Sequence, residues 1–363
     1  MFQTVEMKYP LGSLLAREIA QQPDLWPDTL ERVKSFLRQR TSGFSRVILT
    51  GAGTSGYAAE CIAENWLGAC AIATTDLLLL SPQEIEIRVP GLSEGGVMVS
   101  LARSGNSPES AGVVERMQRL FPAVEHVAIL CNPDCRLAKI DGITVLQLDE
   151  RSNDHSLAMT SSFSNLTLAG LALRHMDTLS QHVPAIAKNM RDHLEAMFAT
   201  ATEIAAEGAS RFVVLASTMH GLTREMTLKS LELTAGVTVG MAESFLGFRH
   251  GPISILRDDT PILCLLSNDP LKRQYEDDVV REFATRGMRN VCLMGGKADT
   301  DMPHRWHVPA LAPSLPDGLR APFEVVFAQL LAYAHSVRVG VNPDDPSPDG
   351  QVTRVVRPFT LYA

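Results

Sequence analysis

The sequence predicts an α/β protein in which helices cover parallel sheets on both faces. Three observations lead to this prediction. Apolar strand patterns alternate with amphipathic helix patterns along most of the 363 residues, which is typical of parallel sheets. The alternation starts again after a long helical pattern at 181–207. Finally, two loops rich in glycine and hydroxyl groups each connect a strand to a helix, as in α/β folds that bind ligands at one sheet edge.

The elements of the first half follow from the period of the apolar residues. An amphipathic helical segment is expected within 1–45. The alternation then predicts strands near 46–51, 69–75, 96–102, 126–131 and 143–148, and helices near 55–67, 107–121 and 158–176.

In the second half, the helix at 181–207 is expected to join two similar regions. The pattern predicts strands near 211–217, 261–267, 290–295 and 305–309, and helices near 221–235, 270–286 and 321–339. The tail at 340–363 contains several Pro and Asp residues up to Gly350 and is expected to be a loop. Beyond Gly350, apolar and polar residues alternate over 352–359, and this segment is expected to run extended over the surface.

The second half resembles a diverged copy of the first. RFVVLASTMHG (211–221) is similar to RVILTGAGTSG (46–56), and PILCLLSNDP (261–270) is similar to GVMVSLARSGNSP (96–108). The second copy lacks the glycines and most of the loop hydroxyls. We therefore expect the loops of the first copy alone to bind a phosphate group.

These patterns divide the chain into four parts. Hydrophobic residues make up 45% of the chain, which suffices for two domains with their own cores. The expected parts are a helical segment (1–45), a first domain (46–185), a second domain (186–345) and a C-terminal tail (346–363).

Composition excludes several classes of function. The net charge of −8 makes nucleic acid an unfavourable partner, because affinity for it comes largely from clustered Lys and Arg. No apolar stretch reaches membrane-spanning length, and the N-terminus lacks the pattern of a signal peptide. The six cysteines match no zinc spacing and are expected to be buried, reduced thiols. We therefore expect a cytoplasmic protein with no membrane partner.

The loops after the first and third strands are the candidate phosphate site. GAGTSG (51–56) follows one strand, and RSGNSP (103–108) follows another. Backbone N–H groups at a helix N-terminus, together with hydroxyls, bind phosphate well. Ser107 suits an N-cap and Pro108 suits the first helical position. On its own, the second loop is equally well explained as a turn and a cap.

Two features of the second half could carry acid–base chemistry. In TREMTLKSLELTAG (223–236), Glu225, Lys229 and Glu232 recur at helical spacing. Most such stripes are solvated salt bridges, but Glu232 lies between two leucines near the helix end and could transfer protons near neutral pH. His250, followed by Gly251 and Pro252, is expected at a helix start or tight turn. A lone histidine is more often structural, although glycines permit a ligand to approach closely.

Together these motifs resemble the sugar isomerase (SIS) domain family. GAGTS (51–55), SLARSGNSPE (100–109), LKSLELTAG (228–236) and GFRHGP (247–252) occur in the order and spacing of that family. LAMTSS (157–162) and VTRVV (352–356) are closest to its group of tagatose-6-phosphate ketose/aldose isomerases, which is linked to galactosamine-6-phosphate deamination. The resemblance implies two tandem SIS domains, each a flavodoxin-like three-layer α/β/α sandwich with a mainly parallel sheet.

The resemblance also implies roles for individual residues. Glu232 would shuttle a proton between C1 and C2 of the sugar, and His250, often lent by the partner subunit, would open the sugar ring. Arg354 takes the place of a family lysine that meets the sugar carbonyl, and it would stabilise charge because arginine stays protonated. The tail that carries it would lie over the active site. Phosphate binding would involve Gly53, Thr54, Ser55, Arg103, Ser104, Gly105, Asn106, Ser107 and Thr160.

The implied reaction converts galactosamine 6-phosphate to tagatose 6-phosphate and ammonia, without a metal or other cofactor. The alternatives are a glucosamine-6-phosphate deaminase and a simple phosphosugar aldose–ketose isomerase. A homodimer, or a dimer of dimers, is expected. GAGTSG also fits the G-x-G-x-x-G fingerprint of dinucleotide-binding proteins, with Asp76 as the acidic residue that would bind the ribose. An NAD-dependent oxidoreductase is therefore a further alternative. A non-catalytic phosphosugar sensor is another, although it would have no need of Glu232 or His250.

Overall fold

The computed structural model describes residues 12–41, 43–296, 301–347, 349–357 and 359–362. Residues 1–11 of the predicted helical segment, and residues 348, 358 and 363 of the predicted tail, lie outside this part of the chain. The chain forms two compact units. The first unit consists of Asp24–Val183 and the tail from Asp349, and the second consists of Pro184–Pro348 and an N-terminal segment ending at Pro23.

The first unit contains a parallel sheet of five strands in the order β2-β1-β3-β4-β5. The strands are β1 (Val47–Thr50), β2 (Ala69–Ala71), β3 (Gly96–Ala102), β4 (Val124–Leu130) and β5 (Ile143–Gln147). The helices are α3 (Gln22–Gln39), α4 (Thr54–Ala63), α5 (Thr74–Leu79), α6 (Pro82–Arg88), α7 (Pro108–Leu120) and the first part of α8 (Ser161–Ala206). Short 3₁₀ helices occur at Leu92–Glu94, Leu137–Lys139 and Glu150–Ser152.

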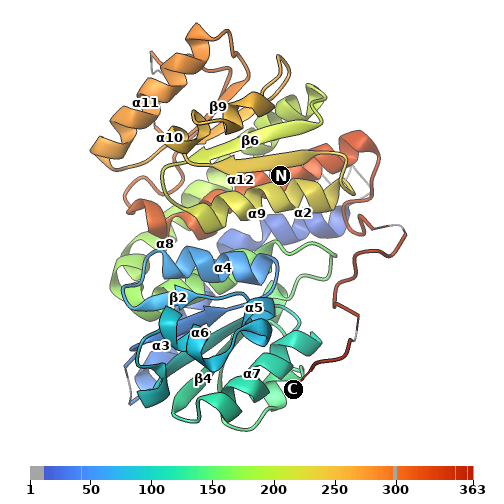
Figure 1. Ribbon diagram of the computed structural model, residues 1–363. Helices are drawn as coiled ribbons and strands as arrows, with labels where there is room; N and C mark the ends of the chain where they lie inside the picture. Colours follow the sequence, from blue (N-terminus) through green and yellow to red (C-terminus); the bar gives the residue numbers. More distant parts are fainter. Residues whose placement is uncertain (1–11, 42, 297–300, 348, 358, 363) are drawn as a thin grey trace. The chain divides into compact units, whose positions relative to one another are not determined.

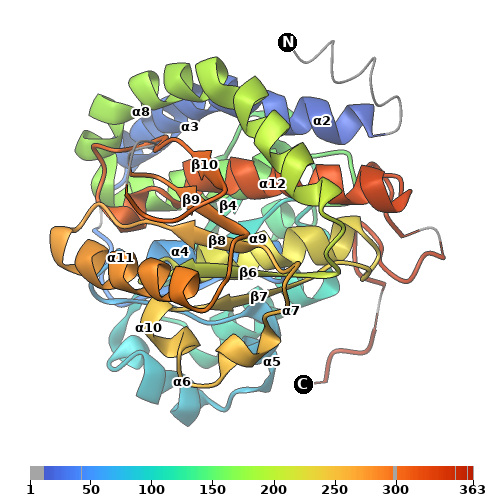
Figure 2. The same ribbon diagram turned by 90° about the horizontal axis from the view of Figure 1, so that it is seen from above.

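Apolar side chains from α5, α6 and α7 form one core of the first unit against the sheet. Leu77, Ile85 and Val113 pack there with Ile48 and Met98 of the two central strands. Elsewhere in this unit, α3 lies alongside the first part of α8 (Figure 2), and the Trp26 indole donates a hydrogen bond to Ser164 Oγ at 3.2 Å. These helices therefore support the sheet whose strands β1 and β3 lead into the two glycine- and hydroxyl-rich loops.

The second unit contains a parallel sheet with the same strand order. Read from its edge, the order is β7-β6-β8-β9-β10. The strands are β6 (Arg211–Ala216), β7 (Val239–Glu243), β8 (Ile262–Leu265), β9 (Val291–Met294) and β10 (Trp306–Val308). The helices are α2 (Ser13–Ala20), the rest of α8, α9 (His220–Leu233), α10 (Phe245–Phe248), α11 (Pro270–Thr285) and α12 (Ala321–Val339), with 3₁₀ turns η4 (Pro252–Ile255) and η5 (Asp317–Leu319).

Helices lie on both faces of this second sheet. Figure 1 shows α10 and α11 on one side of the strands and α9 with α12 on the other. Phe245, Phe248 and Phe283 pack against buried strand residues such as Val213 and Ile262. Both units are therefore α/β layers with parallel sheets, as predicted. In the part of the chain that the structure describes, no helix combines the length and hydropathy that crossing a membrane requires.

The structure differs from the expected elements in several places. The strand expected at 69–75 ends at Ala71, because Thr74 begins α5. The helices expected at 158–176 and 181–207 are one element, α8, whose backbone departs from helical geometry at His175 (φ −119°, ψ 32°). The edge strand β7 was not predicted. It is half-exposed, so it lacks the continuous apolar run of a buried parallel strand. The described residues within 352–359 form bends and no strand.

Candidate active site

The loop between β1 and α4 presents a helix N-terminus without a side-chain cap. Gly53 is the N-cap residue at φ 55°, and its position has no capping side chain. A Cβ on Gly51 would lie 2.5 Å from the Ser55 carbonyl group, so only glycine lets the loop pack this closely on the first turn. Thr54 and Ser55 are both largely buried. The first turn of α4 has no side-chain cap, so this helix N-terminus, with the Ser55 hydroxyl beside it, can face an anion.

The loop between β3 and α7 has the same character. Ser107 is the N-cap residue and Pro108 the first helical residue, as predicted, but the Ser107 side chain makes no capping bond. Gly105 has φ 62°, and a Cβ there would collide with Cys135 Sγ. The loop is braced by Asn106, whose Oδ1 accepts the Arg136 N–H at 2.9 Å. The N-terminus of this 13-residue helix therefore has no side-chain cap, and its positive dipole end can face an anionic ligand.

Arg103 braces the surroundings of this loop from within. Its side chain is buried, and it donates hydrogen bonds to the carbonyls of Ser156 (3.2 Å), Leu157 (2.9 Å) and Arg354 (3.0 Å). These contacts join three segments that are distant in sequence. Arg103 can therefore position the loop, whereas Ser104 (8% exposed) and Ser107 carry the hydroxyls next to the helix.

Thr160 lies at the start of α8, where a buried carboxylate holds the backbone. Asp154 accepts the N–H groups of Thr160 (2.7 Å), Ser161 (3.1 Å) and Ser162 (2.8 Å), and the hydroxyls of all three. Sequence reasoning missed Asp154 because it stands several residues before the helix that it caps. In the structure, the donors of Thr160 thus face a carboxylate of the protein itself.

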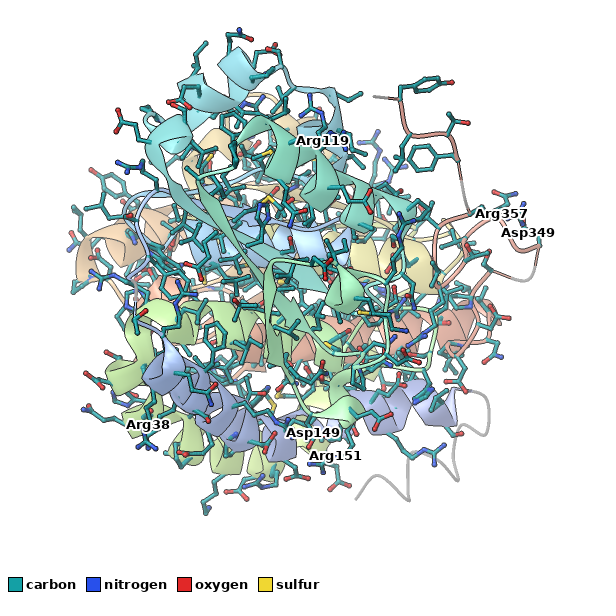
Figure 3. The ribbon with its side chains drawn as sticks, turned by 90° about the horizontal axis from the view of Figure 1, so that it is seen from below. Arg38, Arg119, Asp149, Arg151, Asp349 and Arg357 are labelled. Atoms are coloured by element: carbon teal, nitrogen blue, oxygen red, sulfur yellow. The ribbon has the colours of Figure 1, made fainter. Side chains whose placement is uncertain are left out.

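Arg354 fastens the tail to the segment that carries Asp154. Its guanidinium donates to the Asp154 carbonyl at 2.6 and 3.0 Å and to Asn153 Oδ1 at 2.7 Å. Farther along the tail, Arg357 donates to the Gly350 carbonyl at 3.0 Å, and Figure 3 shows Arg357 close to Asp349. The described tail is therefore held by arginine contacts to the first unit and within itself.

The second unit contains a buried charge cluster on α9. Lys229 Nζ lies 2.6 Å from Glu232 Oε2 and 3.2 Å from Glu225 Oε1. The side chains of Lys229 and Glu225 are fully buried, whereas that of Glu232 is 22% exposed. Burial alone would lower the pKa of Lys229, but the charges of the two glutamates outweigh it and raise that pKa. The charged form of Lys229 is therefore favoured, and its ammonium pairs with the partly exposed Glu232 carboxylate.

The position of Glu232 near the end of α9 follows from the chain reversal after it. Thr234 is the C-cap, and Ala235 and Gly236 both have positive φ (49° and 83°). The Gly236 N–H donates to the Leu231 carbonyl at 2.9 Å, which closes the last turn. Glu232 thus lies in the last turn of a well-terminated helix, and a partly exposed carboxylate so held can accept a proton.

His250 lies on an exposed turn between α10 and η4, as predicted. Its N–H donates to the Gly247 carbonyl at 3.0 Å. Gly251 has φ 130°, and a Cβ on Gly247 would lie 2.5 Å from Ser244 Oγ, so both positions favour glycine. The imidazole is exposed, so it can exchange protons with a bound molecule. Among the described residues, no group of three or more His, Cys, Asp or Glu side chains could hold a metal ion.

Comparisons with known proteins agree with this arrangement. No model of a protein family matches the chain. The D-galactosamine-6-phosphate deaminase AgaS of Shewanella sp. (strain ANA-3) is 32% identical, with 96% of this chain and 91% of the relative covered. A Streptomyces coelicolor protein, to which the same name is provisionally given, is 36% identical. The match covers 96% of this chain and 94% of that protein. The crystal structure of tagatose-6-phosphate ketose/aldose isomerase from Escherichia coli is similar with a TM-score of 0.78 at 30% identity, covering 92% of this chain and 96% of that one. The fold, the two loops and the full-length similarity together place this chain in the family of the AgaS D-galactosamine-6-phosphate deaminases, which are SIS-type phosphosugar enzymes.

Proposed function

We propose that this protein converts galactosamine 6-phosphate to tagatose 6-phosphate and ammonia. The observation that carries the proposal is the Glu232 carboxylate, which is partly exposed and held 2.6 Å from a fully buried ammonium. An aldose–ketose isomerisation by proton transfer needs a positioned base that moves a proton between neighbouring carbons, and a carboxylate can serve as that base. The relatives that share the whole length of the chain carry the name of this deaminase.

The phosphate of the sugar would bind at the two loops of the first unit. The hydroxyls of Ser55, Ser104 and Ser107 and the N–H groups around Gly53, Thr54, Gly105 and Asn106 would donate to it. Arg103 and Thr160 would also belong to this site, and their described hydrogen bonds to carbonyls of the protein and to Asp154 would hold them in place. Binding energy from this non-reacting phosphate would help to orient C1 and C2.

The proton transfers would belong to His250 and Glu232. His250 would move the proton that opens the sugar ring. Glu232 would then take the proton from C2, which leaves an enolamine, and would return a proton to C1. The resulting imine at C2 adds water and releases ammonia, so one water is consumed for each ammonia formed. Arg354 would stabilise charge, because an arginine that stays protonated forms no Schiff base readily.

An assay of ammonia release tests this proposal. We expect ammonia from galactosamine 6-phosphate, with tagatose 6-phosphate formed in equal amount. Glucosamine 6-phosphate and the N-acetyl forms of both sugars are the comparison substrates. Faster release from glucosamine 6-phosphate would favour the gluco alternative, and isomerisation without ammonia would favour the simple isomerase. A change in NAD(H) absorbance during turnover would favour the oxidoreductase.

We further propose that the protein acts in the cytoplasm as a homodimer, or a dimer of dimers, in which His250 serves the partner's site. His250 is exposed on a glycine-flanked turn, from which a side chain can reach a neighbouring molecule. Glu232→Gln and His250→Ala homodimers should each be nearly inactive. Mixed and refolded together, the two variants should recover up to about a quarter of the wild-type activity. With random pairing about half of the dimers are hybrids, and each hybrid has one intact site of two. Hybrids that stay inactive would place both residues in one chain's site.

A further inference from the structure

The second unit has loops that correspond to the phosphate loops of the first. Because the two sheets share one strand order, β6 and β8 of the second unit correspond to β1 and β3. Ser217 follows β6, and Ser267 follows β8. Asp269 and Pro270 are the N-cap and first residue of α11, as Ser107 and Pro108 are of α7. The second pair of loops thus meets one sheet edge in the same way.

A carboxylate of the protein joins these two loops. Glu276 of α11 is fully buried, and its Oε1 accepts the Ser217 hydroxyl at 2.6 Å. Its Oε2 accepts the Ser267 N–H at 2.7 Å. One oxygen therefore binds a hydroxyl of the loop after β6, and the other binds a backbone donor of the loop after β8. A bound phosphate would bridge the two loops in this manner.

Two further carboxylates, those of Asp269 and Asp317, accept backbone N–H groups of this region. Asp269 accepts the N–H groups of Leu271 and Lys272, each at 3.0 Å, whereas Ser107 caps nothing in α7. Asp317 Oδ1 accepts the Asn268 N–H at 2.7 Å, and Arg320 lies 3.1 Å from the same oxygen. The helix N-terminus that has no side-chain cap in the first unit is therefore capped by a carboxylate in the second.

We propose that the Glu276 carboxylate is a built-in substitute for the phosphate that the corresponding loops of the first unit bind. This inference rests on the proposed phosphate site of the first unit. Its consequence is that the loops of the second unit take no phosphate ester. Each chain then binds one sugar phosphate, and the second unit is left to supply Glu232 and His250.

The first experiment measures phosphate binding by calorimetry with inorganic phosphate. The wild-type chain should bind one phosphate, and the Ser104→Ala/Ser107→Ala chain should lose at least tenfold in affinity. A second phosphate site in either chain would overturn the proposal, since the loops of the second unit would then be open. A wild-type chain that binds no phosphate would instead count against the proposed site of the first unit.

The second experiment empties the Glu276 position. Glu276→Ala removes four non-hydrogen atoms, the same number that acetate contains. The side chain is fully buried, but its partner Ser217 is half-buried, so acetate has only a short path from solvent. Acetate should raise the melting temperature of Glu276→Ala saturably above its value in chloride of equal ionic strength. Asp278→Ala is the control, because Asp278 is on the same helix and 80% exposed. An acetate response no larger than that of the control would contradict the proposal, and this readout does not depend on the first unit.

Discussion

The replacement of Lys229 by methionine tests how the candidate base is held. Lys229 is fully buried between Glu225 at 3.2 Å and Glu232 at 2.6 Å. Lys229→Met keeps most of the side-chain volume but removes the ammonium, so the buried Glu225 carboxylate loses the charge that compensates it. Breaking a buried pair in this way costs about 3–5 kcal/mol. We therefore expect the free energy of unfolding to fall by about that amount.

Urea unfolding, followed by fluorescence and circular dichroism, measures this loss. Lys188→Met is the matched control, because Lys188 also pairs at 2.6 Å, with Asp192, but is 75% exposed. An exposed pair contributes only about 0–1 kcal/mol. Glu225→Leu in the Lys229→Met chain should restore most of the stability, since apolar residues can replace a buried pair. If Lys229→Met lost no more stability than Lys188→Met, the cluster would not hold Glu232 as described.

Three further predictions concern the loops and the core. Ser104→Ala and Ser107→Ala should each weaken substrate binding by about 1–3 kcal/mol with the fold intact, so a steady-state KM unchanged in both variants would count against the phosphate site. Gly105→Ala should weaken binding more than either, because φ is 62° there and the new Cβ would collide with Cys135; a KM equal to the wild-type value would refute this. Burial lowers the pKa of His126 to about 4, so the neutral form is favoured in the folded state and stability should fall as pH drops from 6.5 toward 4. Between pH 7 and pH 4.5 the wild-type chain should lose about 2.5 kcal/mol of unfolding free energy through His126. Urea unfolding at both pH values should show that the His126→Leu chain loses about 2.5 kcal/mol less than the wild type. An equal loss in the two chains would contradict the prediction.

The architecture could be predicted because parallel strands leave a clear signal. The interior strands β1, β3, β6 and β8 are buried and read as continuous apolar runs, so the alternation of elements is plain. The half-exposed edge strand β7 lacks this signal. The two glycine-containing loops between strand and helix, after β1 and β3, could be predicted as well. Gly105 adopts a positive φ, and Gly51 packs against the Ser55 carbonyl.

The positions of buried carboxylates could not be predicted in the same way. Asp154 caps a helix that begins at Ser161, well beyond the spacing of an ordinary N-cap. Glu276 lies within an amphipathic helix and meets Ser217, 59 residues earlier, only after folding. The family resemblance implied Thr160 as a phosphate ligand, and its contact with Asp154, six residues earlier, could not be foreseen from the sequence. Long-range partners of this kind leave no periodic trace.

The central claim is that Glu232 transfers the C2 proton of an amino-sugar phosphate. The most direct measurement follows ammonia release and the exchange of the C2 hydrogen with solvent, both on galactosamine 6-phosphate, in the wild-type and Glu232→Gln chains. The amide keeps the shape of the side chain but accepts no proton, so both rates should fall by about 10²–10⁴-fold, the usual contribution of a positioned base. Substrate affinity should stay unchanged. A Glu232→Gln chain that exchanges the C2 hydrogen and releases ammonia at near the wild-type rate would contradict the claim.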